Sequence, residues 1–179
     1  AYDAVLWTIG CWNGKALPIE GSDAENCLSG VAFLEAFCQG RLKVGSKKVV
    51  CVGGGDTSID VVSVARRLGH ISTMNDQESP EAIVHGYVAQ DVSESAIKEG
   101  AEVTLTSLFQ KEEMTAAEQE VNDAIHEGVT IINGVIPVRI EKDENNRAVA
   151  IIIAKCAFED NKPVPVEGSE QRIEADLIV

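Results

Sequence analysis

The sequence predicts an α/β fold, in which a Rossmann-like parallel sheet carries helices on both faces and is joined by an antiparallel β hairpin or meander. Residues 49–52 form a short, continuously apolar run, typical of a strand covered on both faces in a parallel sheet. Three glycines follow, and apolar residues then recur at helical spacing over 58–68. From residue 135 onward, the pattern changes to paired strands separated by turn residues.

The other elements follow from periodicity and from turn residues. Residues 28–38 have the pattern of a helix, and the helix that begins at about Thr57 can end at Gly69. Thr115 and Glu118 have the spacing of a capping box for a helix that ends at Gly128. We interpret 71–102 as an insertion. The expected strands lie at 2–10, 49–52, 103–107, 129–132, 135–141, 148–158 and 173–179.

Composition limits the function classes. The 179 residues are 45% hydrophobic and carry a formal net charge of −14, with a pI near 4.5, which opposes a nucleic-acid surface. No apolar run approaches the ~20 residues that span a bilayer, so we expect a cytoplasmic protein without membrane insertion. The five cysteines form no Cys-x-x-Cys pair and no metal-ligand spacing with the histidines, so neither a dithiol centre nor a metal site is expected.

The glycine-rich run at 53–58 is the candidate cofactor site. It matches G-x-G-x-x-G if Ser58, which is small enough for close helix packing, stands in for the third glycine. At such a turn, backbone N–H groups and the helix dipole receive a pyrophosphate. An ordinary turn between strand and helix is the alternative, and no Gly-Lys-Ser/Thr follows to indicate a P-loop. We expect the pyrophosphate region to lie at Gly53, Gly54, Gly55, Asp56 and Thr57.

Further segments, spread over nearly the whole chain, occur in a characteristic order. They are Tyr-Asp-Ala-Val at 2–5 through Ile-Gly at 9–10, Leu-Pro-Ile at 17–19 with Gly21, residues 49–60 with the run Gly-Gly-Gly-Asp-Thr-Ser-Ile-Asp, Arg-Leu-Gly at 67–69, Glu-Glu-Met at 112–114, Val-Pro-Val-Glu-Gly-Ser at 164–169 and Glu-Ala-Asp at 174–176. In this combination the chain resembles the glutamate synthase small-subunit family, whose relatives include the flavin- and nicotinamide-binding region of dihydropyrimidine dehydrogenase.

The resemblance implies an enzyme domain that delivers hydride from NAD(P)H to FAD for onward electron transfer. It assigns 1–40 to a flavin-domain strand and linker, 41–172 to the NAD(P)-binding domain and 173–179 to the return strand. Most of the FAD site would lie outside this chain, which would not be active alone. The implied partners are the FAD domain of the parent protein and a larger oxidoreductase subunit. Hydride chemistry belongs to the nicotinamide and flavin, so no catalytic residue is expected here.

One departure from the family concerns cofactor choice. Where the family often has Tyr-Arg-Arg-Ser-Arg before Glu-Glu-Met, this chain has Ser-Leu-Phe-Gln-Lys at 107–111. The guanidinium groups that favour a 2′-phosphate are missing, so the sequence predicts NADH in preference to NADPH. A non-catalytic module that senses nucleotide or docks a partner is the alternative function. The residues expected around the adenosine ribose are Ser107, Leu108, Gln110 and Lys111.

Overall fold

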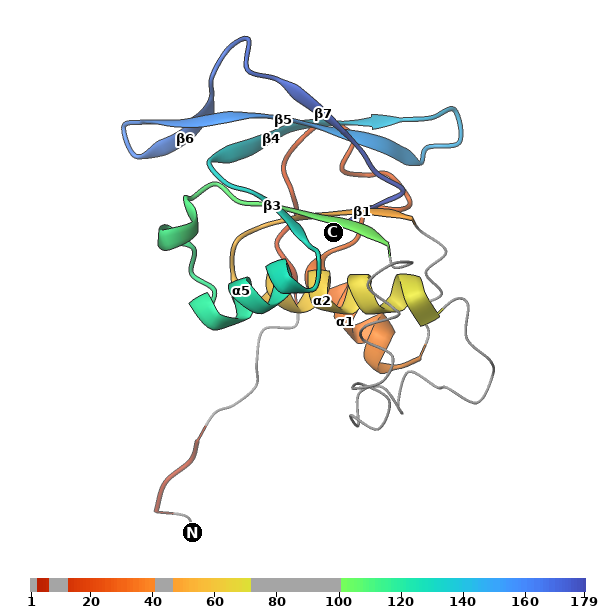
Figure 1. The fold of residues 1–179 in the computed structure, drawn as a ribbon, viewed down its shortest axis with the longest axis vertical. Helices are drawn as coiled ribbons and strands as arrows, with labels where there is room; N and C mark the ends of the chain where they lie inside the picture. Colours follow the sequence, from red (N-terminus) through yellow and green to blue (C-terminus); the bar gives the residue numbers. More distant parts are fainter. Residues whose placement is uncertain (1–2, 7–12, 41–46, 72–100) are drawn as a thin grey trace.

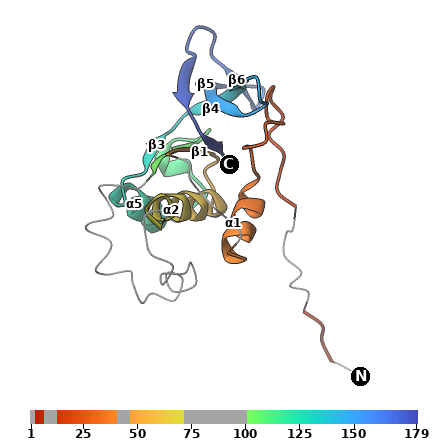
Figure 2. The same cartoon turned by 90° about the vertical axis from the view of Figure 1, so that its right-hand side faces the viewer.

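The computed structural model describes residues 3–6, 13–40, 47–71 and 101–179. They form a layer of helices, a parallel sheet and an antiparallel sheet, stacked in that order (Figures 1 and 2). The helices are α1 (Gly30–Cys38), α2 (Asp56–Ile71), the short 3-10 helix η1 (Lys111–Glu113) and α5 (Glu118–His126). The strands are β1 (Lys48–Val52), β2 (Glu102–Thr106), β3 (Thr130–Ile132), β4 (Val135–Lys142), β5 (Ala148–Glu159), β6 (Lys162–Pro165), β7 (Gln171–Glu174) and β8 (Leu177–Ile178).

The parallel sheet has the strand order β3-β2-β1-β8. Val49 of β1 lies opposite Val103 of β2 on one side and Leu177 of β8 on the other. Buried β-branched residues dominate the two central strands, as expected for a sheet covered on both faces. The predicted strands at 49–52, 103–107 and 129–132 are therefore confirmed within one residue at each end.

The antiparallel sheet is built around the long strand β5. Its first part lies between β4 and β7, and its last residues pair with β6, which the sequence analysis did not predict. The predicted hairpin at 135–141 and 148–158 is confirmed. Its turn contains Asn146 with φ of 59°, a conformation that asparagine tolerates better than most residues.

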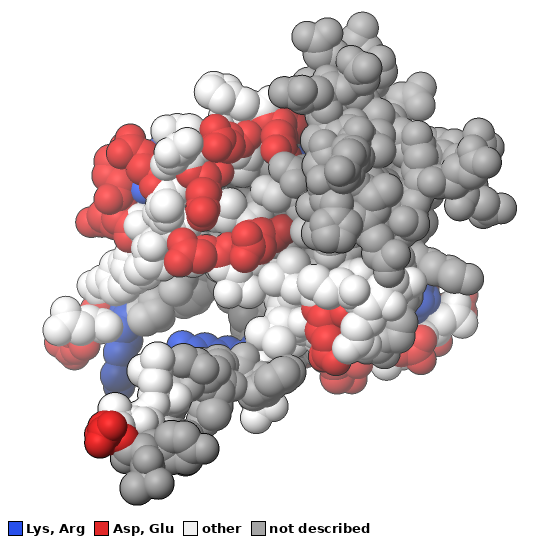
Figure 3. Space-filling view, turned by 90° about the horizontal axis from the view of Figure 1, so that it is seen from below, with Lys and Arg blue, Asp and Glu red and all other residues white. Residues whose placement is uncertain are grey.

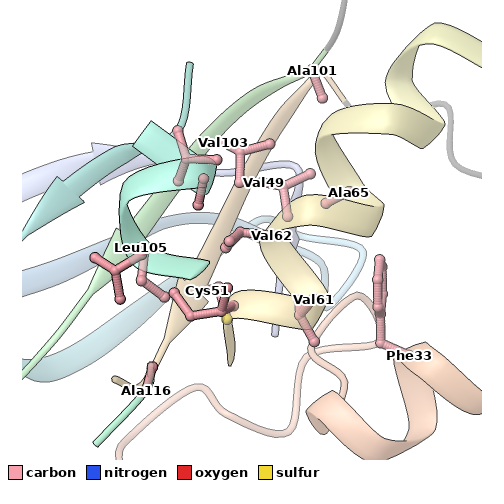
Figure 4. Close-up of a cluster of buried hydrophobic side chains, with 14 of the residues drawn as sticks. Phe33, Val49, Cys51, Val61, Val62, Ala65, Ala101, Val103, Leu105 and Ala116 are labelled. Atoms are coloured by element: carbon pink, nitrogen blue, oxygen red, sulfur yellow. The ribbon is translucent and has the colours of Figure 1, made fainter. Parts of the chain in front are cut away.

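Alternation along β1 divides the core into two clusters. Val49 and Cys51 point toward α1, α2 and α5, where Phe33 and Val61 are completely buried (Figure 4). Val50 points the other way and packs in a cluster with Ile151 and Ile153 of β5. This arrangement confirms the predicted class of fold and corrects one detail. The described helices cover only one face of the parallel sheet, because the apolar side of β5 covers the other.

The last predicted strand, 173–179, is two strands in different sheets. β7 pairs with β5, whereas β8 pairs with β1. The chain changes sheets at Ala175 and Asp176, and the Asp176 carboxylate accepts hydrogen bonds from the backbone N–H groups of Lys47 and Lys48 at 3.0 Å each. Asp176 therefore connects the start of β1 to the segment where the chain crosses from one sheet to the other. Strand periodicity in the sequence does not reveal this crossing.

Two other predicted segments fall largely outside the described residues. In the expected strand 2–10, residues 3–6 form no strand, and the side chains of Val5 and Leu6 are 70% and 86% exposed. A strand needs a hydrogen-bonding neighbour, and neither described sheet pairs with residues 3–6. The rest of that segment and nearly all of the expected insertion 71–102 lie outside the described residues.

Candidate functional site

The carboxyl ends of β1, β2 and β3 meet at one edge of the parallel sheet. The Gly53 N–H donates to the Thr106 carbonyl at 2.9 Å, and the Ser107 N–H donates to the Ile132 carbonyl at 2.9 Å. These bonds place the loops that follow the three strands side by side. In open α/β sheets, ligands bind beside this carboxyl edge. The structure thus brings the glycine-rich loop and the segment that begins at Ser107 together, as predicted.

The glycines of the loop have different roles. Gly53 has φ of 148°, and a Cβ there would collide with Ser58 Oγ, so this glycine permits the turn and the close approach of α2. A Cβ on Gly54 would lie only 2.6 Å from Ser107 Oγ. Gly55 differs, because its Cβ would meet only Thr115 Oγ1, at an ordinary 3.4 Å. Packing within the protein therefore requires glycine at 53 and 54 and leaves room at 55.

Open backbone donors lie next to Gly55. The N–H groups of Ser58 and Ile59 donate to the Gly55 carbonyl at 2.9 and 3.2 Å. Those of Asp56 and Thr57 donate to no acceptor in the described part of the chain, as expected for the first turn of a helix. Both residues are exposed at the N-terminus of α2, where the helix dipole favours an anion. These groups can bind a phosphate.

The side chain of Asp56 is engaged elsewhere. Its Oδ1 accepts a hydrogen bond from the Ala117 N–H at 3.3 Å, at the N-cap of α5. The predicted capping box of Thr115 and Glu118 does not form, because Ala117 is the N-cap and has no side-chain cap. Thr115 instead donates to the Gly54 carbonyl at 3.5 Å. Asp56 therefore joins α2 to α5 through its side chain, while its backbone N–H has no acceptor among the described residues.

The residues predicted around the adenosine ribose follow β2. Ser107 is buried, and its Oγ accepts from the Phe109 N–H at 3.2 Å. Leu108 is half-buried, and Gln110 forms the N-cap of η1 in a capping box with Glu113. Lys111 Nζ donates to Asn122 Oδ1 at 2.8 Å, so this ammonium is held toward α5.

Sequence reasoning missed two residues at this edge. Asn133 directly follows β3, and its Nδ2 donates to the Phe109 carbonyl at 3.0 Å. The rule that ligands bind at carboxyl ends of parallel strands could have identified it, since the strand 129–132 was predicted. Phe158 lies on β5 and stacks on Phe109. Nothing local in the sequence indicates that contact.

The electrostatic surroundings are acidic. Asp and Glu side chains gather on the side of the molecule that carries η1 and α5 (Figure 3). The exposed acidic residues there are Glu112, Glu113, Glu118, Glu120 and Asp123. An anionic ligand at this edge therefore depends on the backbone donors and dipole of α2.

Thiol chemistry is disfavoured at the glycine-rich loop. Burial raises the pKa of Cys51 to about 12, although its Sγ donates weakly to the Ser58 carbonyl at 3.8 Å. The thiol therefore stays protonated at neutral pH and packs as a small apolar group, as predicted. The described residues contain no group of three or more His, Cys, Asp or Glu side chains arranged to hold a metal.

Comparison with known proteins relates the chain to oxidoreductases. No family model matches it. It is 30% identical over 188 residues to the beta subunit of the NADPH-Fe(3+) oxidoreductase of Geobacter sulfurreducens, over 99% of this chain and 23% of that protein. It is 23% identical over 196 residues to the small chain of glutamate synthase [NADPH] of Escherichia coli, over 99% of this chain and 35% of that protein. The chain is homologous to a segment of these oxidoreductases.

The glutamate synthase-like resemblance is thus confirmed, and the chain spans about a quarter to a third of the length of these relatives. Solved structures agree on the fold. FprA of Mycobacterium tuberculosis, in complex with NADPH, matches 99% of this chain and 49% of its own with a TM-score of 0.68 at 14% identity. Among the described residues, no helix has the length and apolarity needed to cross a membrane.

Proposed function

We propose that this chain is the nicotinamide-dinucleotide-binding domain of a flavoprotein oxidoreductase, with the dinucleotide at the carboxyl edge of β1, β2 and β3. The observation that carries the proposal is the pair of N–H groups of Asp56 and Thr57, which have no acceptor among the described residues. They lie beside Gly55, where an added Cβ would meet only Thr115 Oγ1, at 3.4 Å. Homology to oxidoreductases named for NADPH supports it.

The residues present fit a dinucleotide. The N–H groups of Asp56 and Thr57 would hold the pyrophosphate, and the dipole of the 16-residue helix α2 would offset its charge. Gly55 leaves space for it to approach. Ser107 and Leu108 follow β2, where the adenosine would lie. When bound, the nicotinamide would supply hydride to a flavin, and the role of this chain would be to bind and orient the dinucleotide.

We infer a preference for NADH over NADPH from the side chains after β2. Leu108 and Phe109 offer no cation at the end of β2, and Lys111 is hydrogen-bonded to Asn122. Glu112 and Glu113 are exposed immediately beyond it and would repel the additional charge of a 2′-phosphate. The full-length flavoprotein should therefore have a higher kcat/KM with NADH. Preference for NADPH by more than about 10-fold, or ~1.4 kcal/mol, would contradict this.

Calorimetric titration of this chain with NADH, NADPH and ADP-ribose tests nucleotide binding. We expect NADH to bind with a Kd of roughly 1 μM to 1 mM, the usual range of KM for such cofactors, and ADP-ribose to compete with it. Flavin reduction by NADH, followed by stopped-flow absorbance in the full-length protein, tests hydride delivery. Binding without flavin reduction would favour the alternative of a nucleotide-sensing module. Absence of binding would refute the proposed function.

A further inference from the structure

We propose that Phe109 and Phe158 form an aromatic platform on which the adenine of the dinucleotide stacks, an inference that rests on the proposed function. The two rings stack on each other, with centroids 6.0 Å apart and an interplanar angle of 17°. Even so, Phe109 remains 41% exposed and Phe158 53% exposed. A pair of phenyl rings thus presents apolar surface to solvent at the edge where the cofactor would bind.

The two rings come from distant segments that the fold brings together. Phe109 lies in the loop after β2, which ends at Thr106. Phe158 lies where β5 pairs with β6, opposite Pro163. The N–H of Cys156 donates to the Gly134 carbonyl at 2.8 Å, which fastens this part of β5 to the loop after β3. The platform is therefore part of the carboxyl edge.

The backbone of Phe109 is fixed on both sides. Its N–H donates to Ser107 Oγ at 3.2 Å, and its carbonyl accepts from Asn133 Nδ2 at 3.0 Å and from the Gly134 N–H at 3.3 Å. These bonds fix the backbone from which the ring projects, and the ring itself stacks on Phe158. A preformed aromatic surface loses little entropy when a flat ligand stacks on it.

The position and chemistry of the platform select adenine among the parts of a dinucleotide. In a Rossmann-like sheet the pyrophosphate binds at the turn after the first strand, and the adenosine ribose lies on the side of the second. Phe109 follows that second strand, whereas the open N–H groups of Asp56 and Thr57 follow the first. The phenyl rings offer no donor to a phosphate. They offer a π face to a purine, and stacking of bases on aromatic side chains contributes substantially to binding.

Calorimetry on this chain, with NADH and with nicotinamide mononucleotide, tests the platform. Nicotinamide mononucleotide lacks adenine and therefore serves as the matched ligand. We expect Phe109→Ala and Phe158→Ala each to weaken NADH binding by at least about 5-fold, the lower end of the effect of losing one base stack. Binding of nicotinamide mononucleotide should be unchanged. Phe158→Tyr, which keeps the π face, should bind NADH within about 2-fold of the wild type.

Ile125→Ala is the matched control, because Ile125 is 39% exposed on α5, outside the platform, and its truncation should leave NADH affinity unchanged. If the wild type binds NADH and both alanine variants bind it equally well, the platform is refuted and the nucleotide site stands. Equal weakening of both ligands would also refute the platform, since the effect would then be structural. If the wild type binds neither NADH nor ADP-ribose, the proposed function itself fails.

Discussion

The two ends of the parallel sheet differ in whether their polar groups have hydrogen-bonding partners within the protein. At the amino end, the Asp176 carboxylate accepts from the N–H groups of Lys47 and Lys48, and Lys48 Nζ pairs with Glu174. At the carboxyl end, the N–H groups at the start of α2 have no acceptor among the described residues. Charged groups at the amino end are thus paired with each other or with backbone N–H groups. At the carboxyl end, backbone N–H groups remain available to a ligand.

This contrast matters because the amino end contains a cavity of about 240 Å³. Its polar walls are formed by Lys48, Glu102, Thr104, Arg172 and Glu174. Arg172 is already paired with Glu141 at 2.8 Å and with Glu174 at 3.6 Å. A hollow whose charges are mutually neutralised offers little to an ionic ligand. The proposed binding edge is therefore distinguished by backbone donors without acceptors among the described residues, and not by volume.

The largest expected effect comes from adding a side chain at Gly55, at the carboxyl end. Gly55→Val should weaken NADH binding by at least about 100-fold, because the branched side chain would occupy the approach of the pyrophosphate. Its melting temperature should stay near that of the wild type, since the nearest atom to the new Cβ is Thr115 Oγ1 at 3.4 Å. Calorimetry and thermal unfolding measure the two quantities.

The neighbouring variant Gly54→Ala is the comparison. Its Cβ would meet Ser107 Oγ at 2.6 Å, so we expect a lower melting temperature. Unchanged NADH affinity in a folded Gly55→Val protein would remove the glycine-rich loop from the proposed site.

A smaller effect should follow from adding a cation after β2. Leu108→Arg should shift the NADPH to NADH ratio of kcat/KM toward NADPH by about 10-fold, because a guanidinium binds a phosphate bidentately. Steady-state assays of the full-length flavoprotein at one ionic strength measure the ratio. Val149→Arg adds the same charge at the other end of β5 and should leave the ratio unchanged. An equal shift in both variants would indicate a long-range charge effect instead.

At the amino end, changes should alter stability and leave nucleotide affinity unaffected. Asp176→Ala removes the acceptor for two backbone N–H groups and should lower the free energy of unfolding by about 1–2 kcal/mol, measured by urea denaturation. Asp176→Asn keeps a carbonyl acceptor and should cost less. Loss of NADH affinity in either folded variant would show that the two ends of the sheet are coupled, and would contradict a purely structural role for the amino end.

The smallest effect should come from Glu174, which is exposed. Its hydrogen bond with Lys48 lowers the pKa of this carboxyl, as do the charges of Lys48 and Arg172. Its stabilising contribution is therefore complete above the ordinary pKa of glutamate, ~4.3, and is lost as the pH falls through the lower folded value. Glu174→Gln should slightly lower the melting temperature at neutral pH. On acidification, the melting temperature of this variant should fall less than that of the wild type. The difference should shrink in high salt, and a salt-independent difference would contradict the ion-pair explanation.

Local sequence was sufficient for the parts of the site that lie close together in the chain. The strand at 49–52, the turn at 53–55 and the following helix form one continuous unit, and each was predicted from periodicity and glycine placement. Their relation to Ser107 also followed from the sequence, because parallel strands end at a common edge. The roles of Asp56 and Lys111 could not be predicted, since their partners are Ala117, the N-cap of α5, and Asn122 within α5.

The class of fold could be predicted from the chain alone, because alternating and helical apolar spacing indicates which side chains must be buried. The glycine-rich turn could also be predicted, because backbone conformation and close contact at Gly53 act over a few residues. Three features became apparent only in the folded protein: β5 covers the second face of the parallel sheet, 173–179 divides between two sheets, and Phe158 contacts Phe109. These features depend on contacts between segments that are distant in the sequence. Such contacts produce no periodic pattern of apolar residues from which they could be predicted.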